Sequence, residues 1–119
     1  MLYKYKSDYE KIAMGLLSFI PDLKDIAHLQ SEIKWYTAED DRSLFLWKNP
    51  NGDFIGILGV EITDDLLIIR HIAVSPSARN EGLTYAMLSD LAARYPHCKL
   101  MGNIETASII NKWECKKDD

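Results

Sequence analysis

The chain has 119 residues, of which 47% are hydrophobic and 27% are charged, and its formal net charge is −4 at pH 7. This length and composition predict one soluble globular domain, and no apolar run approaches the roughly 18 to 20 residues that span a bilayer. The acidic balance argues against nucleic acid as the main partner, because phosphate binding needs a basic face.

Neither a targeting segment nor a metal site is indicated. The N-terminal residues run into acidic positions with no signal-peptide apolar segment behind them, so we expect a cytoplasmic protein. Cys98 and Cys115 lack CxxC spacing, which favours two reduced thiols. The three histidines, His28, His71 and His97, form no ligand pattern. We therefore expect no metal.

The first third of the chain predicts a strand followed by two helices. Residues 1–6 alternate enough for a strand, and Ser7 with Glu10 has the spacing of a capping box for the first helix, which Pro21 ends. Asp22 is suited to cap the second helix. The net charge also mildly favours a cationic ligand.

A hairpin is predicted next. Residues 44–48 alternate as a strand, 49–52 (NPNG) form a strong turn signal, and 54–62 return as the partner strand. Gly56 and Gly59 weaken that second strand intrinsically, so they indicate bulges or places where another group packs close to the backbone.

The stretch 66–95 predicts a strand, a polar turn and a helix. Two apolar runs make 66–74 a strand buried on both faces, Pro76 stops it, and an amphipathic helix follows Gly82. Residues 98–102 then form a strand parallel to 66–74, which completes a right-handed crossover. Residues 106–113 are predicted to be a last short helix.

A helix that starts directly after a tight turn offers unpaired N–H groups and the positive end of its dipole to an anion such as phosphate. Arg79 lies at the rim of that turn, and Gly82 lets a ligand approach the backbone. The spacing of Arg79, Gly82 and Thr84 resembles the acetyl-CoA pyrophosphate motif of the Gcn5-related N-acetyltransferases. Thr84 departs from it, because the usual motif has Gly or Ala there.

The order of all the predicted elements resembles that family from end to end. The resemblance implies an α+β fold with a mixed, mostly antiparallel sheet and helices on both faces, without the family's last strands. It implies a single N-acetyltransferase domain over 1–115 and a disordered tail at 116–119. Within the family, residues 9–21, 43–48 and 69–76 look most like the small acetyltransferase encoded in bacterial riboflavin operons.

The resemblance also implies a site for acetyl-CoA as co-substrate. Pantetheine would lie in a V between the fourth and fifth strands, with a bulge in the fourth and a backbone N–H near Val74 as oxyanion donor. The implied cofactor-binding residues are Ile72, Ala73, Val74, Arg79, Asn80, Glu81, Gly82, Leu83, Thr84 and Asn103. The break at 19–23 would line the acceptor site, where Asp22 is a candidate to contact a cationic substrate as the alternative to its capping role.

In the family's reaction the acceptor amine attacks the thioester directly. Glu61 and His71 are the candidate general bases by residue type and position, with structural roles as the open alternative. Ile110 stands where the family has a tyrosine that protonates the leaving thiolate, and isoleucine has no proton to donate. Tyr85 and water are the candidate substitutes for that acid.

Two functions follow from this pattern. The first is an acetyl-CoA-dependent N-acetyltransferase that acts on a primary amine of a small molecule or peptide. The second is a catalytically weak CoA-binding module that regulates or scaffolds a partner, which the missing tyrosine favours. The exposed sheet edge left by the absent strands makes a homodimer a further expectation.

Overall fold

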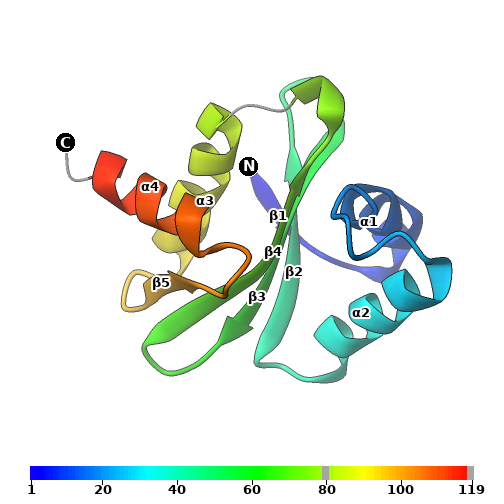
Figure 1. The fold of residues 1–119 in the computed structure, drawn as a ribbon, viewed down its shortest axis with the longest axis horizontal. Coiled ribbons are helices and arrows are strands. Elements are labelled where there is room, and N and C mark those ends of the chain that lie inside the picture. Colours follow the sequence, from blue (N-terminus) through cyan, green and yellow to red (C-terminus); the bar gives the residue numbers. More distant parts are fainter. Residues whose placement is uncertain (79–80, 118–119) are drawn as a thin grey trace.

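The computed structural model describes residues 1–78 and 81–117, which form a five-stranded sheet with helices on both faces (Figure 1). The strands are β1 Leu2–Lys4, β2 Arg42–Lys48, β3 Phe54–Ile62, β4 Leu66–Val74 and β5 Lys99–Gly102. The helices are α1 Glu10–Leu17, α2 Ile26–Ala38, α3 Glu81–Arg94 and α4 Ala107–Lys117, with short 3-10 turns η1 Ser7–Tyr9 and η2 Pro76–Ala78.

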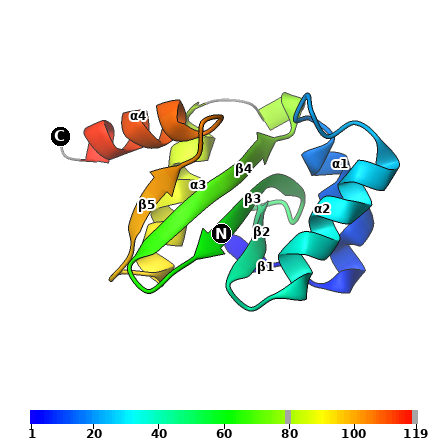
Figure 2. The same ribbon diagram turned by 60° about the horizontal axis from the view of Figure 1, so that its bottom comes forward.

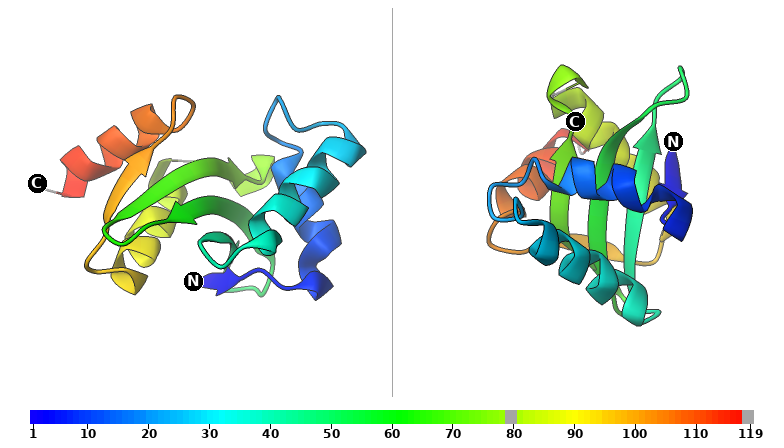
Figure 3. Two further views of the ribbon diagram at one scale, coloured as in Figure 1. Left: turned by 90° about the horizontal axis from the view of Figure 1, so that it is seen from below. Right: turned by 90° about the vertical axis from the view of Figure 1, so that its right-hand side faces the viewer.

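The strand order is β1-β2-β3-β4-β5, antiparallel from β1 to β4, with β5 parallel to β4. Helices α1 and α2 cover one face of the sheet, while α3 and α4 cover the other (Figures 1 and 3). Helix α3 provides the crossover between the two parallel strands. The predicted α+β fold is therefore confirmed, and β3 and β4 have the predicted bounds.

A hydrophobic core lies on each face of the sheet because successive strand residues point to opposite sides. On β2, Phe45 packs in the core beneath α3 and α4, whereas Leu44 and Leu46 pack in the core beneath α1 and α2. All three are at most 2% exposed, so β2 is buried on both faces.

Two predicted helix caps are wrong. The Asp25 carboxylate, not that of Asp22, caps α2 by accepting a hydrogen bond from the His28 N–H at 3.2 Å. A turn in which the Leu23 N–H donates to the Ile20 carbonyl delays the helix start beyond Asp22. Ser7 makes no capping box, because 7–9 form a 3-10 turn and α1 begins only at Glu10.

Helix α4 is longer than predicted. It extends through Lys117, so the predicted disordered tail at 116–119 begins too early, and residues 118 and 119 lie outside the described residues. Trp113 is 5% exposed, and its indole N–H donates to the Ser89 hydroxyl of α3 at 3.0 Å. This contact ties α4 to α3.

The pairing of β3 with β4 contains a bulge. Gly59 pairs with His71 and Val60 pairs with Ile69, which leaves Arg70 as an extra residue on β4. Gly59 is also where α2 approaches the sheet, because a Cβ built on it would lie 2.2 Å from the Tyr36 hydroxyl. The family resemblance predicted a bulge in β4, and the glycines of β3 predicted bulges or close packing against the backbone. Both features are confirmed.

Replacing Gly59 by alanine is therefore expected to destabilise the fold, because the new methyl group overlaps the Tyr36 ring. We expect a loss of about 1 to 3 kcal/mol, the usual cost of overpacking a core. The control is Gly15→Ala on α1, where a Cβ meets nothing within 4 Å. That change should add about 0.5 to 1 kcal/mol by favouring the helix. Urea unfolding of both variants measures the difference, and equal stabilities would contradict it.

Candidate active site

Strands β4 and β5 separate halfway along β4. Their last paired residues are Ile69 and Gly102, whereas β4 continues to Val74 (Figure 2). Two side chains that follow β5 bind carbonyls of β4 at this point. The Asn103 amide donates to the Arg70 carbonyl at 3.2 Å, and the Thr106 hydroxyl donates to the Ile69 carbonyl at 2.7 Å. The V-shaped opening thus begins at the bulge.

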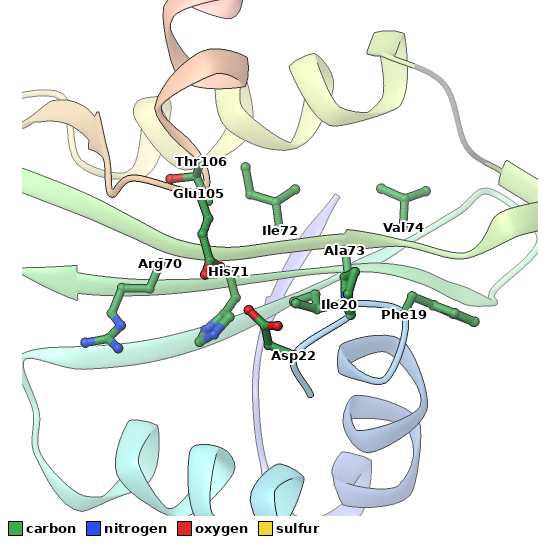
Figure 4. Close-up of a pocket in the computed structure, with 11 residues that line it drawn as sticks. Phe19, Ile20, Asp22, Arg70, His71, Ile72, Ala73, Val74, Glu105 and Thr106 are labelled. Atoms are coloured by element: carbon green, nitrogen blue, oxygen red, sulfur yellow. The ribbon is translucent and has the colours of Figure 1, made fainter. Parts of the chain in front are cut away.

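A cavity of about 570 Å³ lies at this opening. Three segments enclose it: the turn between α1 and α2, the second half of β4, and the loop that leads into α4 (Figure 4). Its lining residues are Phe19, Ile20, Pro21, Asp22, Arg70, His71, Ile72, Ala73, Val74, Glu105 and Thr106. Residues 19–22 of the break that was expected to line an acceptor site are among them.

His71 is the buried titratable side chain of the cavity. It is 9% exposed, and its Nδ1 lies 2.5 Å from the hydroxyl of Tyr36 on α2. Burial lowers the pKa of His71, and the Glu32 carboxylate partly opposes that shift. Burial also raises the pKa of Tyr36, so its phenol stays protonated. The cavity therefore contains a neutral imidazole held by a neutral phenol at neutral pH.

Two carboxylates flank His71. Asp22 comes from the turn between the first two helices, and Glu105 extends from the loop before α4 toward the imidazole (Figure 4). Both residues are exposed, so their carboxylates remain hydrated. Arg70 supplies the positive charge in the lining. Asp22, which does not have its predicted capping role, thus lines the cavity instead.

Glu61, the other candidate base, does not line the cavity. Its carboxylate accepts a hydrogen bond from the Arg70 guanidinium at 3.1 Å across β3 and β4. The same guanidinium lies over the Trp35 ring, 4.3 Å from its centroid. The structure therefore places Glu61 as the ion partner of Arg70, whereas it places His71 in the cavity.

The residues expected to hold acetyl-CoA fall into two groups. Ile72, Ala73 and Val74 line the cavity, and Asn103 lies at the end of β5. Glu81, Gly82, Leu83 and Thr84 form the first turn of α3, as the strand-turn-helix pattern predicted. Arg79 and Asn80 lie outside the described residues.

Neither position considered for a tyrosine acid lies in the cavity. Ile110 is 1% exposed and packs in the core beneath α3 and α4. Tyr85 lines a separate groove between α3 and α4, where the Lys116 ammonium lies 5.4 Å from its ring centroid. No tyrosine is among the residues that line the cavity.

Sequence reasoning missed Tyr36, Glu105 and Thr106. Tyr36 occupies an apolar position of an amphipathic helix, so the pattern indicated only core. Glu105 and Thr106 follow Asn103 at the end of β5, and that proximity was the available signal. Within 1–78 and 81–117, no group of three or more His, Cys, Asp or Glu is arranged to hold a metal ion. In the same residues, no helix combines the length and apolarity needed to cross a membrane.

The fold and the opening at β4 define the class of protein. The model of the acetyltransferase (GNAT) family matches residues 7–112, and the chain belongs to that family. A curated relative, "Uncharacterized N-acetyltransferase in lysA 3'region" of Bacillus methanolicus, is 46% identical over 115 residues, covering 96% of this chain and 95% of the relative. The protein is thus an N-acetyltransferase of the GNAT type.

Solved structures support the same fold at low sequence identity. AAC(6')-Iy in complex with the bisubstrate analog CoA-S-monomethyl-acetylneamine is 12% identical, with a TM-score of 0.74 over 98% of this chain and 87% of that chain. A chimera of the spermidine N-acetyltransferase SpeG from Vibrio cholerae and hSSAT is 11% identical, with a TM-score of 0.71 over 96% of this chain and 78% of that chain.

The lowered pKa of His71 predicts how stability changes with pH. The unfolded chain binds a proton at this histidine more readily than the folded chain, so protonation favours unfolding. The contribution is fully present above about pH 6.5 and is lost as the pH falls toward the folded-state pKa. We expect the free energy of unfolding of the wild type to fall more steeply than that of His71→Gln between about pH 7.5 and about pH 5.5. Parallel slopes in urea titrations would contradict this.

Proposed function

We propose that the protein transfers the acetyl group of acetyl-CoA to a cationic primary amine of a small molecule or peptide. One observation carries this proposal: a single cavity joins the open part of β4 to the carboxylates of Asp22 and Glu105 and to the imidazole of His71. The thioester would enter along β4, and the amine would approach from the acidic side.

The donor assignment is supported by the first turn of α3. A helix N-terminus binds phosphate through its unpaired N–H groups, and Gly82 places no side chain in the way. Arg79 would add a charge-assisted bond to the pyrophosphate. Structural neighbours are bound to CoA or to a CoA-containing analog. Pantetheine would then extend along Ile72, Ala73 and Val74, with Asn103 at its border.

The acceptor assignment is supported by charge. Asp22 and Glu105 would attract an ammonium ion, and the chain as a whole has a formal net charge of −4. Solved neighbours are described as aminoglycoside and spermidine N-acetyltransferases, whose acceptors are small amines. The ammonium must lose a proton before its nitrogen lone pair attacks the thioester carbon. The C–N bond then forms, the C–S bond breaks, CoA leaves as the thiolate, and the nitrogen loses its second proton to water to give the neutral amide.

A second function, a catalytically weak CoA-binding regulatory or scaffold module, is favoured by one observation. Ile110 stands where the resembled family has its tyrosine acid, and none of the described residues that line the cavity is a tyrosine. A CoA thiolate is nevertheless stable enough to leave unprotonated, so the missing acid would slow the reaction without stopping it. We therefore rank the enzyme first.

Two narrower features belong to the same proposal. The resemblance to the acetyltransferase of bacterial riboflavin operons supports a related genomic setting. A homodimer would cover the apolar side chains along the β5 edge, where Met101 is 44% exposed and Ile104 is 98% exposed.

Calorimetric titration with acetyl-CoA, followed by a screen of polyamines, aminoglycosides and amino-terminal peptides for release of the CoA thiol, tests the proposal. Binding with acetylation of at least one cationic amine supports the enzyme. Binding without acetylation of any amine supports the module instead. Absence of acetyl-CoA binding would overturn both.

The carboxylates should act on acceptor affinity alone. Asp22→Asn and Glu105→Gln are each expected to raise KM for a cationic amine by up to about fivefold, because exposed ion pairs contribute about 1 kcal/mol at most. The affinity for acetyl-CoA should not change. Asp64→Asn, which removes the same charge from the exposed turn between β3 and β4, is the matched control. Equal KM values in all three variants would remove the carboxylates from the acceptor site.

The pyrophosphate contact should depend on Arg79. Arg79→Ala is expected to weaken acetyl-CoA binding by about 1.5 to 3 kcal/mol, the range for hydrogen bonds to charged groups. Calorimetry measures the loss, and Lys24→Ala, which removes an exposed cation from the turn before α2, is the control. An unchanged dissociation constant for Arg79→Ala would place the pyrophosphate elsewhere.

A further inference from the structure

We propose that Tyr36 is a positioning residue for His71: its hydroxyl donates to Nδ1, so that the neutral imidazole keeps its proton on Nε2 and presents an N–H donor to the cavity. The part of this proposal that concerns catalysis rests on the proposed function. The part that concerns the protonated nitrogen stands on the structure alone.

The donor and acceptor follow from the surroundings of Tyr36. Its side chain is 2% exposed, and its hydroxyl lies 2.5 Å from His71 Nδ1. The Arg70 guanidinium also approaches this hydroxyl, but a guanidinium can only donate to it. A buried hydroxyl that donates to nothing is costly, so the phenol proton must point at Nδ1. A neutral imidazole has one donor and one acceptor nitrogen. Because Nδ1 accepts, Nε2 carries the proton.

Three elements fix this pair in place. The bulge at Arg70 turns both Arg70 and His71 toward the face covered by α2, as Figure 4 shows. Gly59 lies opposite His71 on β3 and leaves room for the Tyr36 hydroxyl, since a Cβ there would lie 2.2 Å from it. Helix α2 supplies Tyr36 itself, whose ring meets the imidazole edge to face at 5.7 Å between centroids.

Burial keeps His71 neutral at pH 7, although charged groups surround it. Burial is the largest cause of its lowered pKa, and Arg70 and His28 act in the same direction. Glu32 on α2 and Glu105 before α4 oppose them. Asp22 also lines the cavity, from the turn between the first two helices. Since burial prevails, the tautomer of the neutral ring decides what His71 offers to a ligand.

This tautomer assigns the proton-transfer roles. An Nε2 that already carries a proton cannot accept another from the amine, so the ammonium proton passes to water in the open cavity. His71 instead donates a hydrogen bond to the thioester carbonyl oxygen, which gains negative charge as the amine attacks. His71 is thereby an oxyanion donor in place of a general base.

Nitrogen-15 NMR tests the tautomer without any substrate. Long-range proton–nitrogen correlations distinguish a protonated ring nitrogen from an unprotonated one, and the spectrum of His71→Gln identifies the signals of His71 by their loss. We expect an unprotonated Nδ1 and a protonated Nε2 in the wild type, and a mixture of both tautomers in Tyr36→Phe. A wild type protonated at Nδ1, or a Tyr36→Phe spectrum identical to that of the wild type, would overturn the proposal.

Two substitutions at His71 test the catalytic role. The glutamine amide in His71→Gln retains an N–H donor but cannot accept a proton, whereas His71→Ala has neither property. With the amine found in the screen, we expect His71→Ala to lose about 100-fold in kcat, as for loss of one oxyanion donor, and His71→Gln to remain at least about tenfold faster than His71→Ala.

Equal loss in the two variants, with cooperative melting and acetyl-CoA binding intact in both, would show that His71 accepts a proton and would overturn the assignment. Tyr36→Phe should lower kcat while leaving KM for acetyl-CoA unchanged, and a kcat equal to that of the wild type would contradict the role of Tyr36. If no amine is acetylated by the wild type, the proposed function fails, and the NMR result still decides the tautomer.

Discussion

The extra residue on β4 is the constraint from which the site follows. Side chains along a strand alternate between faces, so residues of one parity share a side. Ile69 packs in the core beneath α3 and α4, whereas Ala73, of the same parity, packs in the core beneath α1 and α2. The bulge at Arg70 causes this change of face. It places His71 on the face where Tyr36 and the 19–22 turn lie.

The same point on β4 also ends its pairing with β5. The side chains of Asn103 and Thr106 donate hydrogen bonds to the carbonyls of Arg70 and Ile69. These carbonyls therefore keep hydrogen-bond partners where the two strands separate. At Ile69 and Arg70, the side chains of β4 change faces and the pairing of β4 with β5 ends. The edge of β4 is therefore exposed beside the buried side chain of His71. The cavity is the direct consequence of these two local events.

The sequence predicted what local chemistry determines and missed what tertiary contacts determine. The bounds of β3 and β4 followed from apolar runs between strong turn signals. The start of α2 did not, because Asp22 and Asp25 are both good caps and the turn ahead of the helix decided between them. The sequence did not predict Tyr36 as a site residue, because its hydrogen-bond partner, His71, lies 35 positions away.

The contact with Arg70 explains why Glu61 is better understood as the ion partner of Arg70 than as a general base. The bulge turns the guanidinium onto the helix-covered face, where its Nε is buried without a hydrogen-bond partner within the described residues. A half-buried cation beside His71 and Tyr36 needs a counter-ion, and Glu61 on the neighbouring strand provides it at 3.1 Å. The ion pair therefore engages the Glu61 carboxylate away from the cavity and balances the positive charge of Arg70 next to the imidazole.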